Sequence, residues 1–196
     1  HRLLLKIRKK RAPILDPFSG SRGHTSPSMA PALFPAGGAL VGWGSNTSSP
    51  WYELTPHTIA VHVLTTRFSL GQSHLPALLR TRLELFRTIC LPSIAAQTSQ
   101  HFRWVIVVDK RKVHEEISAL VASMPNVAVY KATLKTSQEV YESPAAHQLE
   151  LSGFWAEPVG DRERIYLSTR LDADDALPVG AFEEIRERAR AALSSP

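Results

Sequence analysis

The chain has 196 residues, of which 43% are hydrophobic and 21% are charged, and this composition is that of a globular protein. No apolar run is long enough to cross a bilayer, so no transmembrane segment is expected, and the single cysteine, Cys90, excludes an intramolecular disulfide and a cysteine-based zinc site. The net charge is +5, but the first 50 residues carry +6 and leave −1 for the remainder. A near-neutral body does not predict a nucleic-acid-binding face, so no nucleic-acid partner is expected.

The first 55 residues predict a disordered arm or leader. A short basic segment is followed by a stretch rich in Ser, Pro and Gly that reaches Pro50. Such a segment cannot bury enough apolar surface to offset the entropy lost on ordering. It is similar to an organellar transit peptide, although a plain linker would look the same, and we otherwise expect a cytoplasmic location. The sequence thus predicts an arm over residues 1–55 and a domain over residues 56–196.

From Thr58 onward, short apolar runs alternate with amphipathic stretches. The apolar runs predict strands over residues 59–64, 104–108, 127–130 and 164–169. Apolar residues spaced three and four apart predict helices over residues 75–90, ending near Pro92, and over 113–123, 137–154 and 179–193. This alternation predicts an α/β fold with a mostly parallel sheet and helices on both faces.

An acidic cluster of Asp172, Asp174 and Asp175 lies between the last predicted strand and the last predicted helix. Ligands of open α/β sheets bind beyond the carboxyl ends of the strands. Three carboxylates within four residues repel one another unless solvent or a cation compensates, and oxygen ligands suit magnesium or manganese. The alternative is a solvated acidic turn whose carboxylates favour the positive end of the following helix. Spacing alone leaves both interpretations open.

Several segments together resemble a known class of enzymes. Residues 91–98 (Leu-Pro-Ser-Ile-Ala-Ala-Gln-Thr), the strand that ends in Val-Val-Asp at residue 109, and the acidic cluster resemble the opening of A-fold glycosyltransferases. Residues 64–68 (Leu-Thr-Thr-Arg-Phe) followed by residues 82–86 (Arg-Leu-Glu-Leu-Phe) resemble the rhamnosyltransferase family more narrowly. The resemblance covers about residues 58 to 190.

The resemblance implies a Rossmann-like nucleotide-diphospho-sugar transferase fold and the donor-binding portion of a glycosyltransferase. The implied reaction transfers a sugar, rhamnose by the family's name, from a nucleoside-diphosphate sugar to a hydroxyl of a saccharide or other acceptor. A divalent metal, Mn²⁺ or Mg²⁺, would act as a Lewis acid on the departing nucleoside diphosphate.

Carried over residue by residue, the resemblance implies a donor-binding site and a metal site. The expected nucleotide-sugar-binding residues are Thr65, Arg67, Asp109, Arg170, Asp172 and Asp175, and the expected metal ligands are Asp172 and Asp174. Each has a simpler interpretation as a loop cap, a surface cation or a turn carboxylate, and Asp175 could cap the following helix.

The sequence departs from the family pattern in two places. It ends 21 residues after Asp175, where the family continues into acceptor-binding segments, so we expect a truncated domain and assign no general base. The turn after the central strand reads Lys110-Arg111-Lys112 instead of a run rich in Asp, Gly and Ser. Two alternatives also stay open: a non-catalytic nucleotide-binding domain without its acceptor half, and a protein whose basic arm anchors it to an acidic surface or to nucleic acid.

Overall fold

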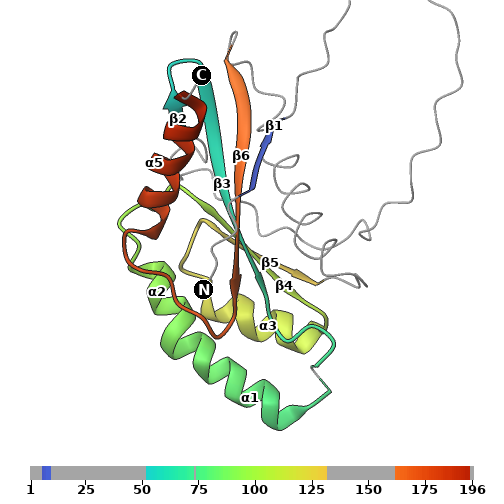
Figure 1. Cartoon of the computed structure of the whole chain (residues 1–196). Coiled ribbons are helices and arrows are strands. Elements are labelled where there is room, and N and C mark those ends of the chain that lie inside the picture. Colours follow the sequence, from blue (N-terminus) through green and yellow to red (C-terminus); the bar gives the residue numbers. More distant parts are fainter. Residues whose placement is uncertain (1–5, 10–51, 73, 132–161, 195–196) are drawn as a thin grey trace, which may run out of the picture.

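The structure, a computed structural model, describes residues 6–9, 52–72, 74–131 and 162–194 (Figure 1). Strands and helices alternate along most of this part of the chain. The strands are β1 (Lys6–Lys9), β2 (Tyr52–Thr55), β3 (Thr58–Arg67), β4 (Arg103–Val108), β5 (Val127–Lys131) and β6 (Glu163–Asp172). The helices are α1 (Pro76–Leu85), the π-helical turn η1 (Phe86–Cys90), α2 (Leu91–Ala95), α3 (Arg111–Leu120) and α5 (Ala181–Ser194).

The strands form a six-stranded mixed sheet with the order β1-β6-β3-β4-β5, and β2 also pairs with β3. The pairs β3–β4, β3–β6 and β4–β5 are parallel, whereas β1–β6 and β2–β3 are antiparallel. Strand β6 pairs with the whole length of β3 on one side. On the other side, β2 pairs with the first residues of β3 and β4 pairs with its last residues. The predicted α/β class is confirmed, and the more specific A-fold architecture stays a prediction.

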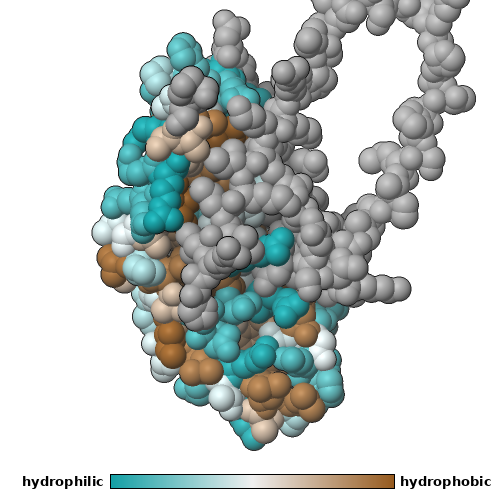
Figure 2. All heavy atoms as spheres, viewed as in Figure 1, coloured by the Kyte–Doolittle hydropathy of each residue, from teal (hydrophilic) through white to brown (hydrophobic). Residues whose placement is uncertain are grey.

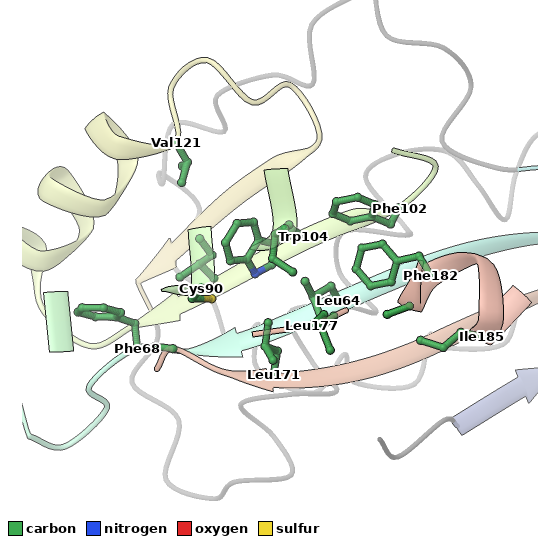
Figure 3. Packing of buried hydrophobic residues seen from close by; sticks show 14 of the residues in the cluster. Leu64, Phe68, Cys90, Phe102, Trp104, Val121, Leu171, Leu177, Phe182 and Ile185 are labelled. Atoms are coloured by element: carbon green, nitrogen blue, oxygen red, sulfur yellow. The ribbon is translucent and has the colours of Figure 1, made fainter. Parts of the chain in front are cut away.

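One face of the sheet carries the hydrophobic core. Side chains alternate between the two faces of a strand, and those of Leu64, Trp104 and Leu167 point to the face that packs against the helices. Figure 3 shows Leu64, Trp104 and Leu171 together with Cys90 and Phe182 from the helices. Every described helix contributes buried residues to this cluster. The predicted helix over residues 137–154 lies outside the described residues, so helices on the second face stay a prediction.

The strands and helices predicted from periodicity are largely confirmed, with corrections at the ends of β3, β6 and the first helix. Strand β3 runs to Arg67, so Thr65 and Arg67 lie within the strand and not in the loop after it. The helix predicted to end near Pro92 continues through η1 and α2 to Ala95. In η1 the N–H of Leu91 donates to the carbonyl of Phe86, five residues earlier. A widened turn of this kind accommodates the ring of Pro92, which lacks an N–H, in the first turn of α2.

The last predicted strand is longer than the sequence indicated, and its end changes the position of the acidic cluster. Strand β6 runs to Asp172 and pairs residue for residue with β3, from Thr58 with Glu163 to Arg67 with Asp172. The acidic cluster therefore begins within the sheet instead of in the loop, because the full length of β3 is available as a partner.

Two strands come from the part of the chain that was expected to be an arm. Leu54 of β2 is 1% exposed and joins the core, and its carbonyl accepts a hydrogen bond from Arg190 Nε of α5 at 2.9 Å. Strand β1 pairs with residues 165–168 of β6. The other residues of the predicted arm lie outside the described part of the chain.

Helix α5 covers the core with one face and turns a charged face outward. Phe182, Ile185 and Ala189 are buried, while Glu184 and Arg188 form an ion pair on the exposed side. Figure 2 shows this outer surface as hydrophilic.

Among the described residues, no helix combines the length and the apolar character that a membrane-crossing segment needs.

A histidine lies in the middle of the core. Nε2 of His62 is 2.7 Å from Oγ1 of Thr169, and its ring meets the edge of Phe182 with the centroids 4.8 Å apart. Burial, and to a lesser degree the positive charge of Arg186, lowers the pKa of His62 from 6.5 to about 3. The ring is therefore neutral in the folded protein at neutral pH.

This burial makes the stability of the protein depend on pH. A histidine whose pKa falls on folding binds protons more readily in the unfolded chain, so its contribution is complete above pH 6.5 and is lost as the pH falls toward 3. We expect the unfolding free energy of the wild type to fall by about 2 kcal/mol relative to His62→Gln between about pH 7 and about pH 5. Urea denaturation at each pH measures the difference. The variant of exposed His101, His101→Gln, should follow the wild type, and equal pH slopes for His62→Gln and the wild type would contradict the prediction.

Candidate functional site

The predicted site residues lie at the carboxyl ends of the parallel strands β3, β4 and β6, which we call this edge of the sheet. Arg67, the last residue of β3, is the register partner of Asp172 on β6 and of Val107 on β4. Asp109 follows the end of β4 directly. This edge is the one at which open α/β sheets bind ligands.

The β3–β6 register also sets which face of the sheet these residues occupy. Thr65 pairs with Arg170, and two residues further along each strand Arg67 pairs with Asp172. Because side chains alternate between the two faces of a strand, all four lie on the same face. This face is opposite to the one that packs against the described helices. Sequence positions more than 100 residues apart are thus brought together by one ladder of backbone hydrogen bonds.

Thr65 has an unusual environment. Its side chain is fully buried, and its hydroxyl forms no hydrogen bond among the described residues. A buried hydroxyl without a partner costs about 1–3 kcal/mol, so such groups in native proteins call for an explanation. The hydroxyl has no accessible surface, so it can reach a polar ligand only when the groups that cover it move.

Asp172 to Asp175 form a tight turn, which we name the acidic turn. The N–H of Asp175 donates to the carbonyl of Asp172 at 3.1 Å. Ala173 is 3% exposed and belongs to the core, so it fixes the turn while Asp172 and Asp174 face solvent. Partial burial, then the charges of Asp174 and Asp172, raise the pKa of Asp175. The three carboxylates are therefore close enough to repel one another, and a cation would relieve that repulsion.

The acidic turn lies near the helices as well as at the end of the sheet. Burial raises the pKa of the Cys90 thiol to about 12, and the negative charges of Asp175 and Asp174 add to this effect. Cys90 is the last residue of the π-helical turn η1. It is fully buried, so its thiol is a structural group and not a nucleophile.

Whether the site can hold the expected divalent metal depends on which side chains are available as ligands. In the part of the chain that the structure describes, no three His, Cys, Asp or Glu side chains are grouped as a metal site. Magnesium-type ions in nucleotide sites are usually held by one or two carboxylates, and phosphate oxygens and water complete the shell. The two exposed carboxylates of Asp172 and Asp174 fit this kind of binding and do not fit a cage made by protein alone.

Asp109 has a structural contact that the sequence did not predict. Its Oδ2 accepts a hydrogen bond from the N–H of Gly71 at 2.8 Å and so ties the loop after β3 to the end of β4. That loop contains two left-handed residues, Ser69 with φ 50° and Gly71 with φ 72°. Ser69 is buried. A left-handed conformation raises the free energy of a residue other than glycine, so the surrounding contacts must offset that cost. The expected nucleotide contact of Asp109 stays a prediction.

Two residues of the site region carried no functional prediction. Ser93 and Gln97 contact the segment that follows the acidic turn: Ser93 Oγ accepts from the N–H of Leu177 at 3.3 Å, and Gln97 Nε2 donates to the carbonyl of Pro178 at 2.8 Å. Their spacing of four residues is the available signal, because in a continuous helix it would place both on one side. The sequence cannot show which segment that side meets.

Comparison with known proteins gives one match. Residues 74–195 match the profile of the family described as "Putative rhamnosyl transferase". The matched part includes β4 to β6, all described helices and the acidic turn. No curated protein and no solved structure gives a significant match.

The hydrogen bond between Asp109 and Gly71 should control the loop after β3. We expect Asp109→Ala to speed hydrogen exchange of the Gly71 amide by about 10-fold or more, because a hydrogen bond to a charged acceptor contributes about 1.5–3 kcal/mol. Asp109→Asn is the matched control, since its amide oxygen still accepts the bond. NMR exchange rates measure the effect, and equal rates at Gly71 in both variants would show that the contact does not hold the loop.

Proposed function

The chain belongs to the family described as "Putative rhamnosyl transferase", and we propose on this basis that it binds a nucleoside-diphosphate sugar for transfer of the sugar to an acceptor hydroxyl. Rhamnose is the sugar that the family's description suggests. The acceptor would be a saccharide or another hydroxyl compound.

The observation that carries this proposal is the register between β3 and β6. It places Thr65 beside Arg170 and Arg67 beside Asp172 on one face, next to the acidic turn. A donor of this class has a polar nucleoside, an anionic diphosphate and a sugar. The edge offers each part a suitable group: a buried hydroxyl, two guanidinium groups and a set of carboxylates.

The charges of these residues suit different parts of the donor. Guanidinium groups form bidentate hydrogen bonds with phosphate oxygens, so Arg67 and Arg170 would orient the diphosphate. Carboxylates alone would repel the diphosphate. Asp172 and Asp174 would hold a manganese or magnesium ion, which supplies positive charge to stabilise the departing nucleoside diphosphate.

Thr65 and Asp109 would contribute to orientation at the nucleoside end of the donor. The Thr65 hydroxyl is fully buried, so a hydrogen bond from it would be shielded from water and directional. Asp109 already positions the loop of Ser69 and Gly71 through one carboxylate oxygen. Orientation of this kind lowers the entropy that must be lost when donor and acceptor react. None of the described residues is assigned as the general base.

The proposal predicts metal-dependent binding of nucleoside diphosphates that requires the acidic turn. In calorimetric titrations of nucleoside diphosphates and their sugars, with and without manganese, we expect manganese to strengthen binding to the wild type. Asp174→Ala should weaken the manganese-dependent binding by about 10-fold or more, because it removes one of the two exposed carboxylates. Titration of several sugars on one nucleotide tests whether rhamnose is preferred.

Glu187→Ala is the matched control, because it removes an exposed carboxylate that lies in the middle of α5 and outside the acidic turn. It should bind like the wild type. Binding by neither the wild type nor the variants, with the proteins shown to be folded, would favour the solvated acidic turn over a donor site. Binding without sugar transfer would favour a non-catalytic nucleotide-binding domain.

A further inference from the structure

The segment after the acidic turn is held by the end of helix α2. We name residues 177–182 the linking segment, because they join the acidic turn to the first turn of α5. Ser93 lies in α2, and Gln97 follows its last residue, Ala95, by two positions. Gln97 is 4% exposed, so its amide is shielded from water.

The Gln97 amide uses both of its ends on this segment. Nε2 donates to the carbonyl of Pro178 at 2.8 Å, and Oε1 accepts from the N–H of Phe182 at 3.4 Å. The N–H groups in the first turn of a helix have no partner within the helix, and a buried one needs an acceptor from elsewhere, which Gln97 supplies for Phe182. The amide can make both contacts because its donor nitrogen and its acceptor oxygen are bonded to the same carbon.

Neighbouring groups hold the linking segment in the same way. Ser93 Oγ accepts from the N–H of Leu177 at 3.3 Å and donates to the carbonyl of Cys90 at 2.8 Å. The backbone N–H of Thr98 donates to the carbonyl of Val179 at 3.1 Å. A row of hydrogen bonds therefore fixes residues 177–182 against α2, in addition to the burial of Leu177.

The acidic turn is consequently held at both ends. On one side the β3–β6 ladder runs as far as Asp172. On the other side the contacts of Gln97 begin at Pro178 and those of Ser93 at Leu177. Only residues 173–176, which include Asp174 and Asp175, lie between the two attachments.

We propose that Gln97 is a positioning residue of the donor site, which holds the acidic turn so that its carboxylates converge on the cation and diphosphate of the donor. This inference rests on the proposed donor-binding function. Gln97 touches neither the carboxylates nor the place of the donor and acts through Pro178 and Phe182.

A purely structural role of Gln97 makes a different prediction. If Gln97 only satisfied buried polar groups, its loss would lower the fraction of folded protein and weaken binding equally with and without metal. A positioning role affects the carboxylates, so it changes the ratio of the dissociation constants measured without and with manganese. We name this ratio the manganese enhancement.

The test compares Gln97→Met with Gln100→Met in the full chain. Methionine has a similar length but forms no comparable hydrogen bonds. Gln100 lies three residues further along, and its Nε2 donates to the carbonyls of Gln97 and Ala95, not to the linking segment. Calorimetry with a nucleoside diphosphate gives the manganese enhancement. Hydrogen exchange over residues 173–182 of the ligand-free protein reports the order of the turn without any donor.

We expect Gln97→Met to lower the manganese enhancement by about 10-fold and to speed exchange in residues 173–182, because two hydrogen bonds to that segment are lost. Gln100→Met should match the wild type in both. Ser93→Ala is a milder second variant that removes the acceptor of the Leu177 N–H, and we expect about a 3-fold lower enhancement. It decides the question if Gln97→Met does not fold.

An unchanged manganese enhancement in Gln97→Met, or in Ser93→Ala where only that variant folds, would overturn the positioning role. Absence of manganese-dependent binding by the wild type would instead overturn the proposed function and the donor role of Gln97 with it. The exchange data separate these failures, because they show whether Gln97 orders the acidic turn even when no donor binds.

Discussion

The parallel ladder between β3 and β6 is the constraint on which the rest of the structure depends. It pairs every residue of β3 with one of β6, from Thr58 with Glu163 to Arg67 with Asp172. A shift by one residue would move each side chain of β6 to the other face, so Leu167 and Leu171 would leave the core and Tyr166 and Arg170 would enter it. The large free-energy cost of such a shift fixes the register. The same register brings Arg67 beside Asp172, so the packing of the core determines the geometry of the candidate site.

The sequence predicted much of this framework because the relevant signals are local. Apolar runs and helical periodicity are properties of neighbouring residues, and β3, β4, β5, β6 and the described helices α1, α3 and α5 follow them. Strand β1 has no comparable signal, since its four residues include only one apolar side chain, Ile7, and it forms by pairing with the exposed edge of β6. The predicted end of the first helix was wrong for a related reason. The spacing of apolar residues does not indicate the widened turn before Pro92.

The candidate site could be predicted in its position but not in its contacts. Strand ends and an acidic cluster indicate an edge of a parallel sheet, and Thr65, Arg67, Asp109, Arg170 and Asp172 lie there. The contact of Asp109 with Gly71 and those of Gln97 with the linking segment join residues 38 and more than 80 positions apart. Such contacts depend on how the helices pack on the sheet, which no local pattern encodes. The segment Ser93 to Thr98 was recognisable as a family motif, but its sequence does not indicate that it contacts the residues after the acidic turn.

The π-helical turn η1 connects these observations. A turn of this kind contains one more residue than an α-helical turn, and one residue corresponds to a rotation of about 100° around the helix axis. The extra residue in Phe86–Cys90 therefore contributes to the direction in which Ser93 of α2 points. Phe86 and Cys90 are fully buried, so the core itself holds the widened turn in place. We infer that the position of the acidic turn depends on this irregularity of the helix, which the core stabilises through Phe86 and Cys90.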